Sequence, residues 1–325
     1  MDEIAIGVHA LTKRFGEVQA LSGVDFEVPQ GTVFGLLGPN GAGKTTVIRV
    51  LSTILRPDSG SAEVLGRDVV KEPDAVRRRI GLAGQYAAVD ANLTGRENLE
   101  MVGVLAQMPR PQIAPRAREL LERFQLSDAG DRPLRTYSGG MRRRLDIAAS
   151  LVNKPPILFL DEPTTGLDIT SRNELWEMIR ELVGDGTTVL LTTQYLEEAD
   201  ILATRIAVVD GGRVIANDTP TALKSQLGST VFEMDMRQGG TEQAVAILTP
   251  IVTGRVEREG DHLRITSSEG ARALIEILRT LDGAGLEPDS LTVREPSLDD
   301  VFLALTGHHA EAGASDDQTS EGDAA

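Results

Sequence analysis

The segment GPNGAGKTT, residues 38–46, follows the apolar stretch TVFGLL at residues 32–37 and precedes a helical pattern. This order of strand, glycine-rich loop and helix matches the phosphate-loop pattern G-x-x-x-x-G-K-[ST]. The glycines let backbone N–H groups turn toward phosphate oxygens, Lys44 reaches the outer phosphates, and the Thr45 hydroxyl can ligate Mg²⁺. The segment therefore predicts an α/β fold that binds a nucleoside triphosphate with Mg²⁺. The predicted phosphate-binding residues are Gly38, Pro39, Asn40, Gly41, Ala42, Gly43, Lys44, Thr45 and Thr46.

A second signal is ILFLDE, residues 157–162, an apolar stretch that ends in two acids. Asp161 can hold Mg²⁺ through water, because this cation prefers oxygen ligands. Glu162 can orient and deprotonate the water that attacks the γ-phosphate. An acidic pair after a strand is often only a solvated turn, but its combination with the phosphate loop favours catalysis.

A third signal is YSGGMRRRLDIAASL, residues 137–151. Ser138 is placed to cap a helix, and Gly139 and Gly140 precede its first full turn. A helix N-terminus of this kind is either an ordinary cap or an anion site. The three arginines at 142–144 are interpreted as a solvated, partner-facing stretch, since the net charge disfavours a nucleic-acid patch.

At these residues the chain resembles the ATP-binding subunits of ABC transporters. Residues 38–46 look like the Walker A loop, residues 157–162 like Walker B, YSGGM at 137–141 like the family signature LSGGQ, and TGLD at 165–168 like the D-loop. The resemblance covers residues 4 to about 225. TTQYLEEAD at 192–200 and SLDDVFLALTG at 297–307 are similar to a narrower group, the ATPase subunits of daunorubicin-resistance drug exporters.

The resemblance also implies roles for residues outside the phosphate loop. Gln85 lies at the Q-loop position and is expected to contact nucleotide and metal, and Phe15 is expected to stack on adenine. Asp168 is implied as a D-loop contact. Ser138 and its glycines are implied to close over the nucleotide of a second ATPase subunit, so that a homodimer sandwiches two ATP molecules. ATP binding would close this dimer, and hydrolysis would reopen it.

Two positions depart from the family pattern. The switch position, normally histidine, is Gln194, which can hydrogen-bond a γ-phosphate but carries no positive charge. Met141 replaces the usual glutamine after the signature glycines. Glu162, Gln194 and Lys44 remain the expected catalytic residues, with turnover expected to be modest.

Composition restricts the cellular partners. The 325 residues are 41% hydrophobic and 25% charged, which excludes a wholly disordered or collagen-like chain, and the absence of cysteine excludes a thiolate zinc site. Lys and Arg total 33 against 49 Asp and Glu, so the net charge is 33 − 49 = −16, which repels nucleic acid. No stretch approaches 18 consecutive apolar residues. The translocation path is therefore expected on integral-membrane permease subunits, with this chain peripheral on the cytoplasmic face of the cell membrane.

The chain is predicted to have two domains and a tail. Residues 1–228 are interpreted as a P-loop ABC cassette with a helical subdomain at about 86–155, where Thr94 and Glu97 form a T-x-x-E capping box. Residues 229–307 have the order βαββαβ, typical of a small ferredoxin-like α+β domain with a regulatory or assembly role. Residues 308–325 are acidic and predicted to be disordered, and the two histidines there are interpreted as chance neighbours.

The last helix pattern, residues 297–307, has apolar positions at 298, 301, 302 and 305, a stripe that must be buried. It is expected either to pack on its own domain or to dock on a cassette. Ser297 is the expected N-cap and Gly307 the expected stop.

Three functional classes fit these motifs. The preferred one is an ATP-hydrolysing subunit that energises export of drug-like or lipophilic compounds. A soluble ABC protein acting on ribosomes or DNA generally carries two cassettes or cysteine zinc modules, and this chain has one cassette and no cysteine. A nucleotide-sensing regulator, with the small domain binding a ligand, is the third class. Association with a permease separates the first class from the other two.

Overall fold

The computed structural model describes residues 3–84, 89–227, 230–237 and 240–307. The chain divides into two compact units between Asn217 and Asp218. The predicted boundary at Gly228 falls outside the described residues, as do Gln85 and the predicted tail at 308–325. The division lies earlier than predicted because helix α8 (Pro220–Ser225) contacts helix α11 (Leu298–Thr306) in the second unit.

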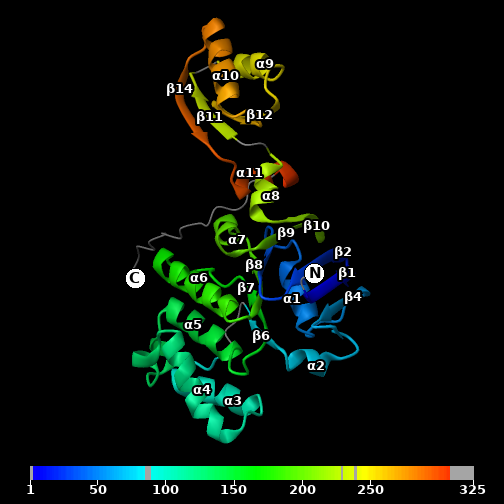
Figure 1. The fold of residues 1–325 in the computed structure, drawn as a ribbon, viewed down its shortest axis with the longest axis vertical. Coiled ribbons are helices and arrows are strands. Elements are labelled where there is room, and N and C mark those ends of the chain that lie inside the picture. The colour runs from blue at the N-terminus through cyan, green and yellow to red at the C-terminus, as the bar shows by residue number, and fades with distance from the viewer. Residues whose placement is uncertain (1–2, 85–88, 228–229, 238–239, 308–325) are drawn as a thin grey trace, which may run out of the picture. The chain divides into compact units, whose positions relative to one another are not determined.

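The first unit is built on a six-stranded sheet with the order β10-β9-β3-β8-β7-β6 (Figure 1). Strands β9, β3, β8, β7 and β6 are parallel to their neighbours in this order. Every residue of β3, β7 and β8 is buried, the pattern expected of parallel strands covered on both faces. The strands are β3 (Val33–Leu37), β6 (Ile80–Ala83), β7 (Ile157–Asp161), β8 (Thr188–Thr193), β9 (Arg205–Asp210) and β10 (Arg213–Asp218).

A second, antiparallel sheet covers one face of this core. Its order is β2-β1-β4-β5, and its side chains share a hydrophobic cluster with α1 and with Phe34 and Phe159 of the central sheet. The bounds are β1 (Ile4–Phe15), β2 (Val18–Pro29), β4 (Ser59–Val64), β5 (Arg67–Asp68), α1 (Lys44–Leu51) and α2 (Pro73–Arg77). Helix α1 begins directly after the glycine-rich segment, as its sequence predicts.

Helices cover the other face and extend beyond it. Alternate residues of β7, Leu158 and Leu160, pack with α5 and α6, and α3 and α4 lie farther from the sheet (Figure 1). Thr94 caps α3 in a complete capping box with Glu97, which confirms that prediction. The bounds are α3 (Gly95–Leu105), α4 (Arg110–Arg123), the short turns η1 (Ser127–Ala129) and η2 (Leu134–Thr136), α5 (Gly139–Ser150), α6 (Ile169–Gly184) and α7 (Leu196–Leu202).

The second unit has the predicted βαββαβ order. Its antiparallel sheet, β12-β13-β11-β14, packs its apolar face on α9 and α10, with Phe232, Met234 and Ile265 in the core. The alternation seen in the sequence at residues 232–237 is therefore a half-buried strand. The bounds are β11 (Thr230–Met236), α9 (Thr241–Leu248), β12 (Gly254–Glu259), β13 (His262–Ser267), α10 (Ala271–Gly283) and β14 (Pro288–Arg294).

The last helix, α11, is attached to its own unit by charge. Ser297 caps it in a capping box with Asp300, and Gly307 ends it with φ 73°, as predicted. Arg294 of β14 donates to both Asp300 oxygens, at 2.6 and 2.9 Å. Of the apolar stripe, Leu298, Val301 and Phe302 are buried and Leu305 is exposed. The ion pair with Arg294 fits packing of α11 on its own domain. Its contact with α8, which lies within residues 1–228, fits the docking alternative, so each alternative holds in part.

Candidate active site

The phosphate loop holds a buried cation at its centre. The Nζ of Lys44 donates to the carbonyl oxygens of Gly38 (2.7 Å) and Pro39 (3.0 Å). It also lies 3.6 Å from Oε1 of Glu162, which follows β7. The loop is wrapped around this ammonium group, so the lysine is preorganised for a polyanion.

Two glycines of the loop are required by close approach of other backbone. A Cβ at Gly38 would lie 2.1 Å from the carbonyl oxygen of Val209, and one at Gly43 would lie 2.6 Å from that of Ala20. Gly43 also has φ 107°, a conformation that disfavours other residues. These contacts fix the loop against β2 and β9, and thereby position the first turn of α1.

A carboxylate with two hydroxyl donors lies at the end of β7. Oδ1 of Asp161 accepts hydrogen bonds from Oγ1 of Thr192 (2.6 Å) and Oγ1 of Thr45 (3.2 Å). Asp161 and Thr192 are opposite each other in the β7–β8 register, and Thr45 is in the first turn of α1. Thr192 was not predicted as a site residue. The available signal was a threonine pair ending a buried strand just before Gln194.

These oxygens fit the site of a hard cation. Mg²⁺ is usually held by one or two protein oxygens, with phosphate and water completing the octahedron. Thr45 and Asp161 supply such oxygens next to the phosphate loop. No cluster of three or more His, Cys, Asp or Glu side chains suited to a metal occurs in the described ranges, so an all-protein cage is not built there.

Glu162 lies one residue beyond Asp161 in a left-handed backbone conformation, with φ 48°. Its N–H donates to Thr192, to Oγ1 at 3.0 Å and to the carbonyl oxygen at 3.2 Å. Non-glycine residues in this conformation are uncommon and cluster at functional sites. The turn directs the Glu162 carboxylate toward Lys44, while Asp161 bonds Thr45.

Gln194 directly follows β8, the neighbour of β7. In the described structure its Oε1 atom is buried and has no hydrogen-bond partner. Buried amide oxygens are normally satisfied, so an unpaired one requires an explanation. A phosphate-bound water or a polar ligand group would supply it.

Four residues beyond Gln194, α7 places Glu198 in the core, where it accepts a hydrogen bond from Nε1 of Trp176 (3.2 Å). Burial raises the pKa of Glu198 above its ordinary value, and the hydrogen bond from Trp176 opposes this shift. The helix that follows the switch position therefore contains a buried carboxyl group for which burial disfavours the charged form.

The signature segment forms the predicted helix start. Oγ of Ser138 accepts from the Met141 N–H at 3.2 Å, which confirms the cap. The prediction for the following arginines is wrong in part: Arg142 is exposed, but the side chains of Arg143 and Arg144 are only 13% and 14% exposed. Arg143 turns inward to backbone carbonyls and Arg144 pairs with Glu174, so neither is solvated.

The signature and Walker B segments border one hollow. Gly139 and Glu162 line a cavity of about 420 Å³, together with Arg143, Asp146 and the turn at residues 165–167. The start of α5 is thus close to the predicted base.

Two other predicted contacts have different surroundings. Asp168 caps α6, accepting from the N–H and the hydroxyl of Ser171, and these hydrogen bonds lower the pKa of its carboxyl. Phe15 ends β1 as an exposed ring with the Lys13 ammonium 5.7 Å from its centre. This exposure leaves the ring accessible for stacking.

Fold and site together define an ATP-binding cassette of the ABC class: a phosphate loop, an acidic strand end and a capped signature helix on one α/β core. Residues 21–165 match the family model described as ABC transporter. Residues 219–306 match the model described as ATP-binding protein DrrA1-3-like, C-terminal domain. The second match begins near the division between the two units.

Relatives of the same architecture make the family more specific. The chain is 53% identical to daunorubicin resistance ATP-binding protein DrrA2 of Streptomyces coeruleorubidus, over 96% of this chain and 98% of the relative. It is 51% identical to daunorubicin/doxorubicin resistance ATP-binding protein DrrA of Streptomyces peucetius, over 98% and 97%. The chain belongs to the DrrA-type ATP-binding proteins of ABC transporters, the ATPase subunits that energise transport.

Solved cassettes confirm the fold of the first unit. A dimeric ATP-binding cassette in a post-hydrolysis state, bound to ADP and Pi, is 26% identical, with a TM-score of 0.60 over 66% of this chain and 98% of that chain. A cassette in its ADP conformation is 27% identical, with a TM-score of 0.61 over 67% and 91%. Cassettes of this fold thus bind adenine nucleotides and can dimerise.

Proposed function

We propose that this chain hydrolyses MgATP to drive export of drug-like, lipophilic compounds, such as those named in its relatives, through a separate permease. The observation that carries the chemistry is the convergence of Lys44, Thr45, Asp161 and Glu162 at one edge of the sheet. The choice of cargo is supported by the resistance proteins, to which the chain is 53% and 51% identical over nearly its full length.

Each residue has a distinct proposed role. Lys44 binds the outer phosphates, Thr45 and Asp161 hold Mg²⁺, and Glu162 accepts the proton of the attacking water. Mg²⁺ in this position offsets phosphate charge. Gln85 joins the metal and nucleotide contacts by resemblance, and Phe15 stacks on adenine.

The functional unit is proposed to be a homodimer at the cytoplasmic face of the membrane. Ser138, Gly139 and Gly140 of one chain close over the nucleotide of the other, with Asp168 between the two sites. The dimeric solved cassette supports this arrangement. The C-terminal domain, proposed from the sequence at residues 229–307, regulates or stabilises the assembly. The described residues include no helix with the length and apolar character needed to cross a bilayer.

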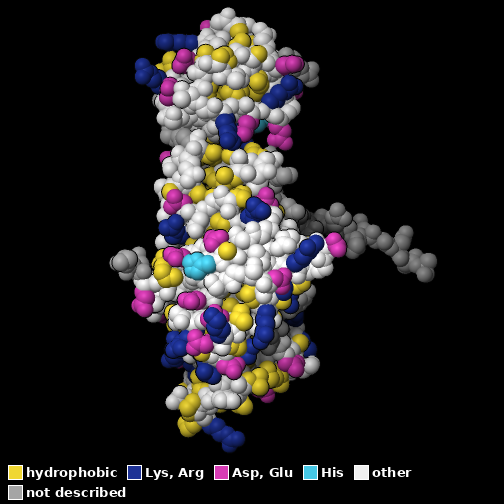
Figure 2. Space-filling view, turned by 90° about the vertical axis from the view of Figure 1, so that its right-hand side faces the viewer, with side chains coloured by type: hydrophobic (Ala, Val, Ile, Leu, Met, Phe, Trp, Pro, Cys, Tyr) yellow, Lys and Arg dark blue, Asp and Glu magenta, His cyan; other side chains and the backbone are white. Residues whose placement is uncertain are grey.

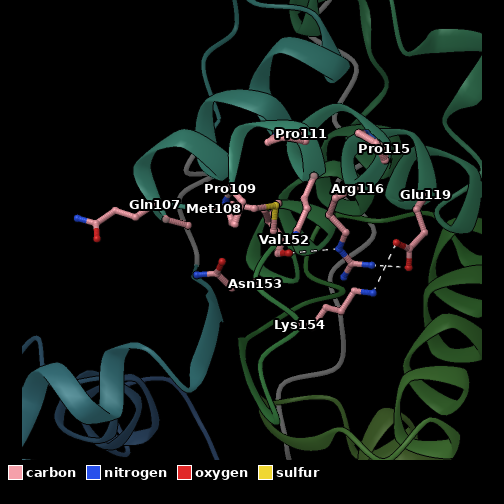
Figure 3. Close-up of a pocket in the computed structure, with 12 residues that line it drawn as sticks. Gln107, Met108, Pro109, Pro111, Pro115, Arg116, Glu119, Val152, Asn153 and Lys154 are labelled. Carbon is pink, nitrogen blue, oxygen red and sulfur yellow. Dashed lines mark hydrogen bonds and ion pairs between the residues drawn. The ribbon is translucent and has the colours of Figure 1, made fainter.

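A groove among the helices of the first unit supports a permease contact. It has a volume of about 640 Å³, with Gln107 and Asn153 at one end and Glu119 and Lys154 at the other (Figure 3). Its wall includes Met108, three prolines and Val152, an apolar surface bordered by charge.

The end of α3 beside this groove is also apolar. Val104 and Leu105 are 63% and 74% exposed, and they directly precede the groove residue Ala106. Hydrophobic side chains gather at the lower end of the molecule in Figure 2, the end occupied by α3 and α4 in Figure 1. We assign this surface to a cytoplasmic segment of the permease, because exposed apolar patches mark interaction sites.

The variant Leu105→Glu tests this contact. It should reduce co-purification with the permease and drug export at least several-fold, because a charge would be buried in an apolar interface. ATP hydrolysis by the isolated chain should stay within about twofold of the wild-type rate, since Leu105 is exposed and distant in sequence from Lys44, Asp161 and Glu162. Ile54→Glu, at a site 58% exposed, is the matched control and should export normally. Export by Leu105→Glu at the wild-type rate would contradict the assignment.

Gln194 should act as a neutral contact to the γ-phosphate or its attacking water. Gln194→Ala should slow hydrolysis about 10-fold or more, because a positioned hydrogen bond is lost. Gln194→His should introduce a pH dependence of the hydrolysis rate at about pH 6.5 that wild type lacks. The measurement is the ratio of the hydrolysis rates of Gln194→His and wild type from about pH 5.5 to 8. If Gln194→Ala turns over like wild type, the side chain has no role at the phosphate.

A further inference from the structure

The buried side chain of Arg143 connects three segments of the first unit. From α5, its Nη1 donates to the carbonyl oxygen of Gly84 (2.6 Å), its Nη2 to that of Asp161 (3.0 Å) and its Nε to that of Pro163 (2.9 Å). Nη1 also contacts Oδ2 of Asp146 at 3.3 Å, which balances its charge. One guanidinium thus joins the signature helix, the end of β7 and the residue before Gln85.

Two of these three carbonyls flank the proposed base, Glu162. Asp161 and Pro163 are the residues on either side of Glu162, whose own backbone is in the uncommon left-handed conformation. Such a conformation persists when the surroundings determine it from several sides. Thr192 holds Glu162 at its N–H, and Arg143 holds the carbonyls before and after it.

We propose that Arg143 is a positioning residue for ATP hydrolysis: it sets the backbone at Glu162 and makes that setting depend on the position of the signature helix. Arg143 is five residues beyond the cap residue Ser138, on the same helix. A displacement of α5 therefore changes the hydrogen bonds on both sides of Glu162. This inference rests on the proposed role of Glu162 as the base.

The geometry requires arginine specifically. A guanidinium presents five N–H donors in a rigid fork, whereas a lysine ammonium is a single nitrogen on a flexible stem. Lysine at position 143 keeps the charge next to Asp146 but cannot reach all three carbonyls, which lie on two separate segments, together. Charge and positioning can therefore be separated by one substitution.

The test measures ATP hydrolysis and ATP affinity of the full chain. Arg143→Ala and Arg143→Lys should both lower kcat about 10- to 100-fold, since a misplaced catalytic group costs that much. ATP affinity should change less than about threefold, because the phosphate loop is untouched. Arg144→Ala, which removes a neighbouring arginine of matched burial paired with Glu174, should keep kcat within about threefold.

A double-mutant cycle separates positioning from general damage. In a Glu162→Gln background, Arg143→Lys should slow the remaining hydrolysis by less than about twofold, because the group it positions is already gone. Three results would each overturn the inference. The first is that the losses of kcat from Arg143→Lys and Glu162→Gln multiply in the double mutant. The others are wild-type turnover of Arg143→Lys and a loss of ATP affinity in Arg143→Lys as large as its loss of kcat. If Glu162→Gln alone leaves hydrolysis intact, the proposed role of Glu162 fails first, which distinguishes the two failures.

Discussion

Replacement of Glu162 by glutamine should lower Mg²⁺-dependent ATP hydrolysis about 10² to 10⁴-fold, the usual contribution of a positioned general base. Glutamine keeps the shape of the side chain but cannot accept the proton of the attacking water. ATP binding should persist, because Lys44 and the glycine-rich loop hold the phosphates independently. Phosphate release under saturating ATP and a nucleotide titration measure the two quantities.

Lys44→Ala supplies the contrasting profile. The ammonium group is buried in the phosphate loop and contacts two of its carbonyls, so its removal should weaken ATP binding itself. Glu162→Gln with wild-type turnover would reject the base assignment. Lys44→Ala with unchanged ATP affinity would reject the phosphate-loop interpretation.

The parts of the site that are contiguous in sequence could be predicted, because each is a local pattern with its own chemistry. The phosphate loop, the acidic strand end and the Ser138 cap all combine a turn with the element next to it. Thr192 could not be assigned, because its role depends on the register that sets it opposite Asp161. Arg143 was misinterpreted because its partners are main-chain carbonyls on segments distant in sequence.

For the fold as well, local patterns could be predicted and contacts between distant segments could not. Buried parallel strands and the βαββαβ order were predicted from periodicity, and both are present. The boundary between units was placed by the change of motif, whereas the structure places it by contact. Helix α8 lies before the change of motif but contacts α11. A contact between segments so far apart in the chain cannot be predicted from a local sequence pattern.

Asp300 should be the largest single contributor of charge to the stability of the C-terminal unit. Its side chain is 2% exposed and bonds Arg294, with Arg264 at 3.7 Å. Asp300→Asn should destabilise α11 and β14 by about 2–3 kcal/mol, below the 3–5 of a fully buried pair because Arg294 is 30% exposed. Hydrogen exchange of these amides in the full chain measures the loss.

The control and the pH dependence make this expectation specific. Asp289→Asn removes an exposed pair with Arg237 and should cost less than about 1 kcal/mol. Burial alone would raise the pKa of Asp300, but hydrogen bonds from Arg294 and Ser297 outweigh it and lower the pKa below 3.8. The stabilisation is therefore complete above the unfolded pKa, near 3.8, and is lost as the pH falls through the folded value. The difference between wild type and Asp300→Asn should accordingly be constant from about pH 5 to 8 and shrink under stronger acid. A difference that instead grows on acidification, or equal costs for Asp300→Asn and Asp289→Asn, would show that α11 is held by its apolar stripe and not by this carboxylate.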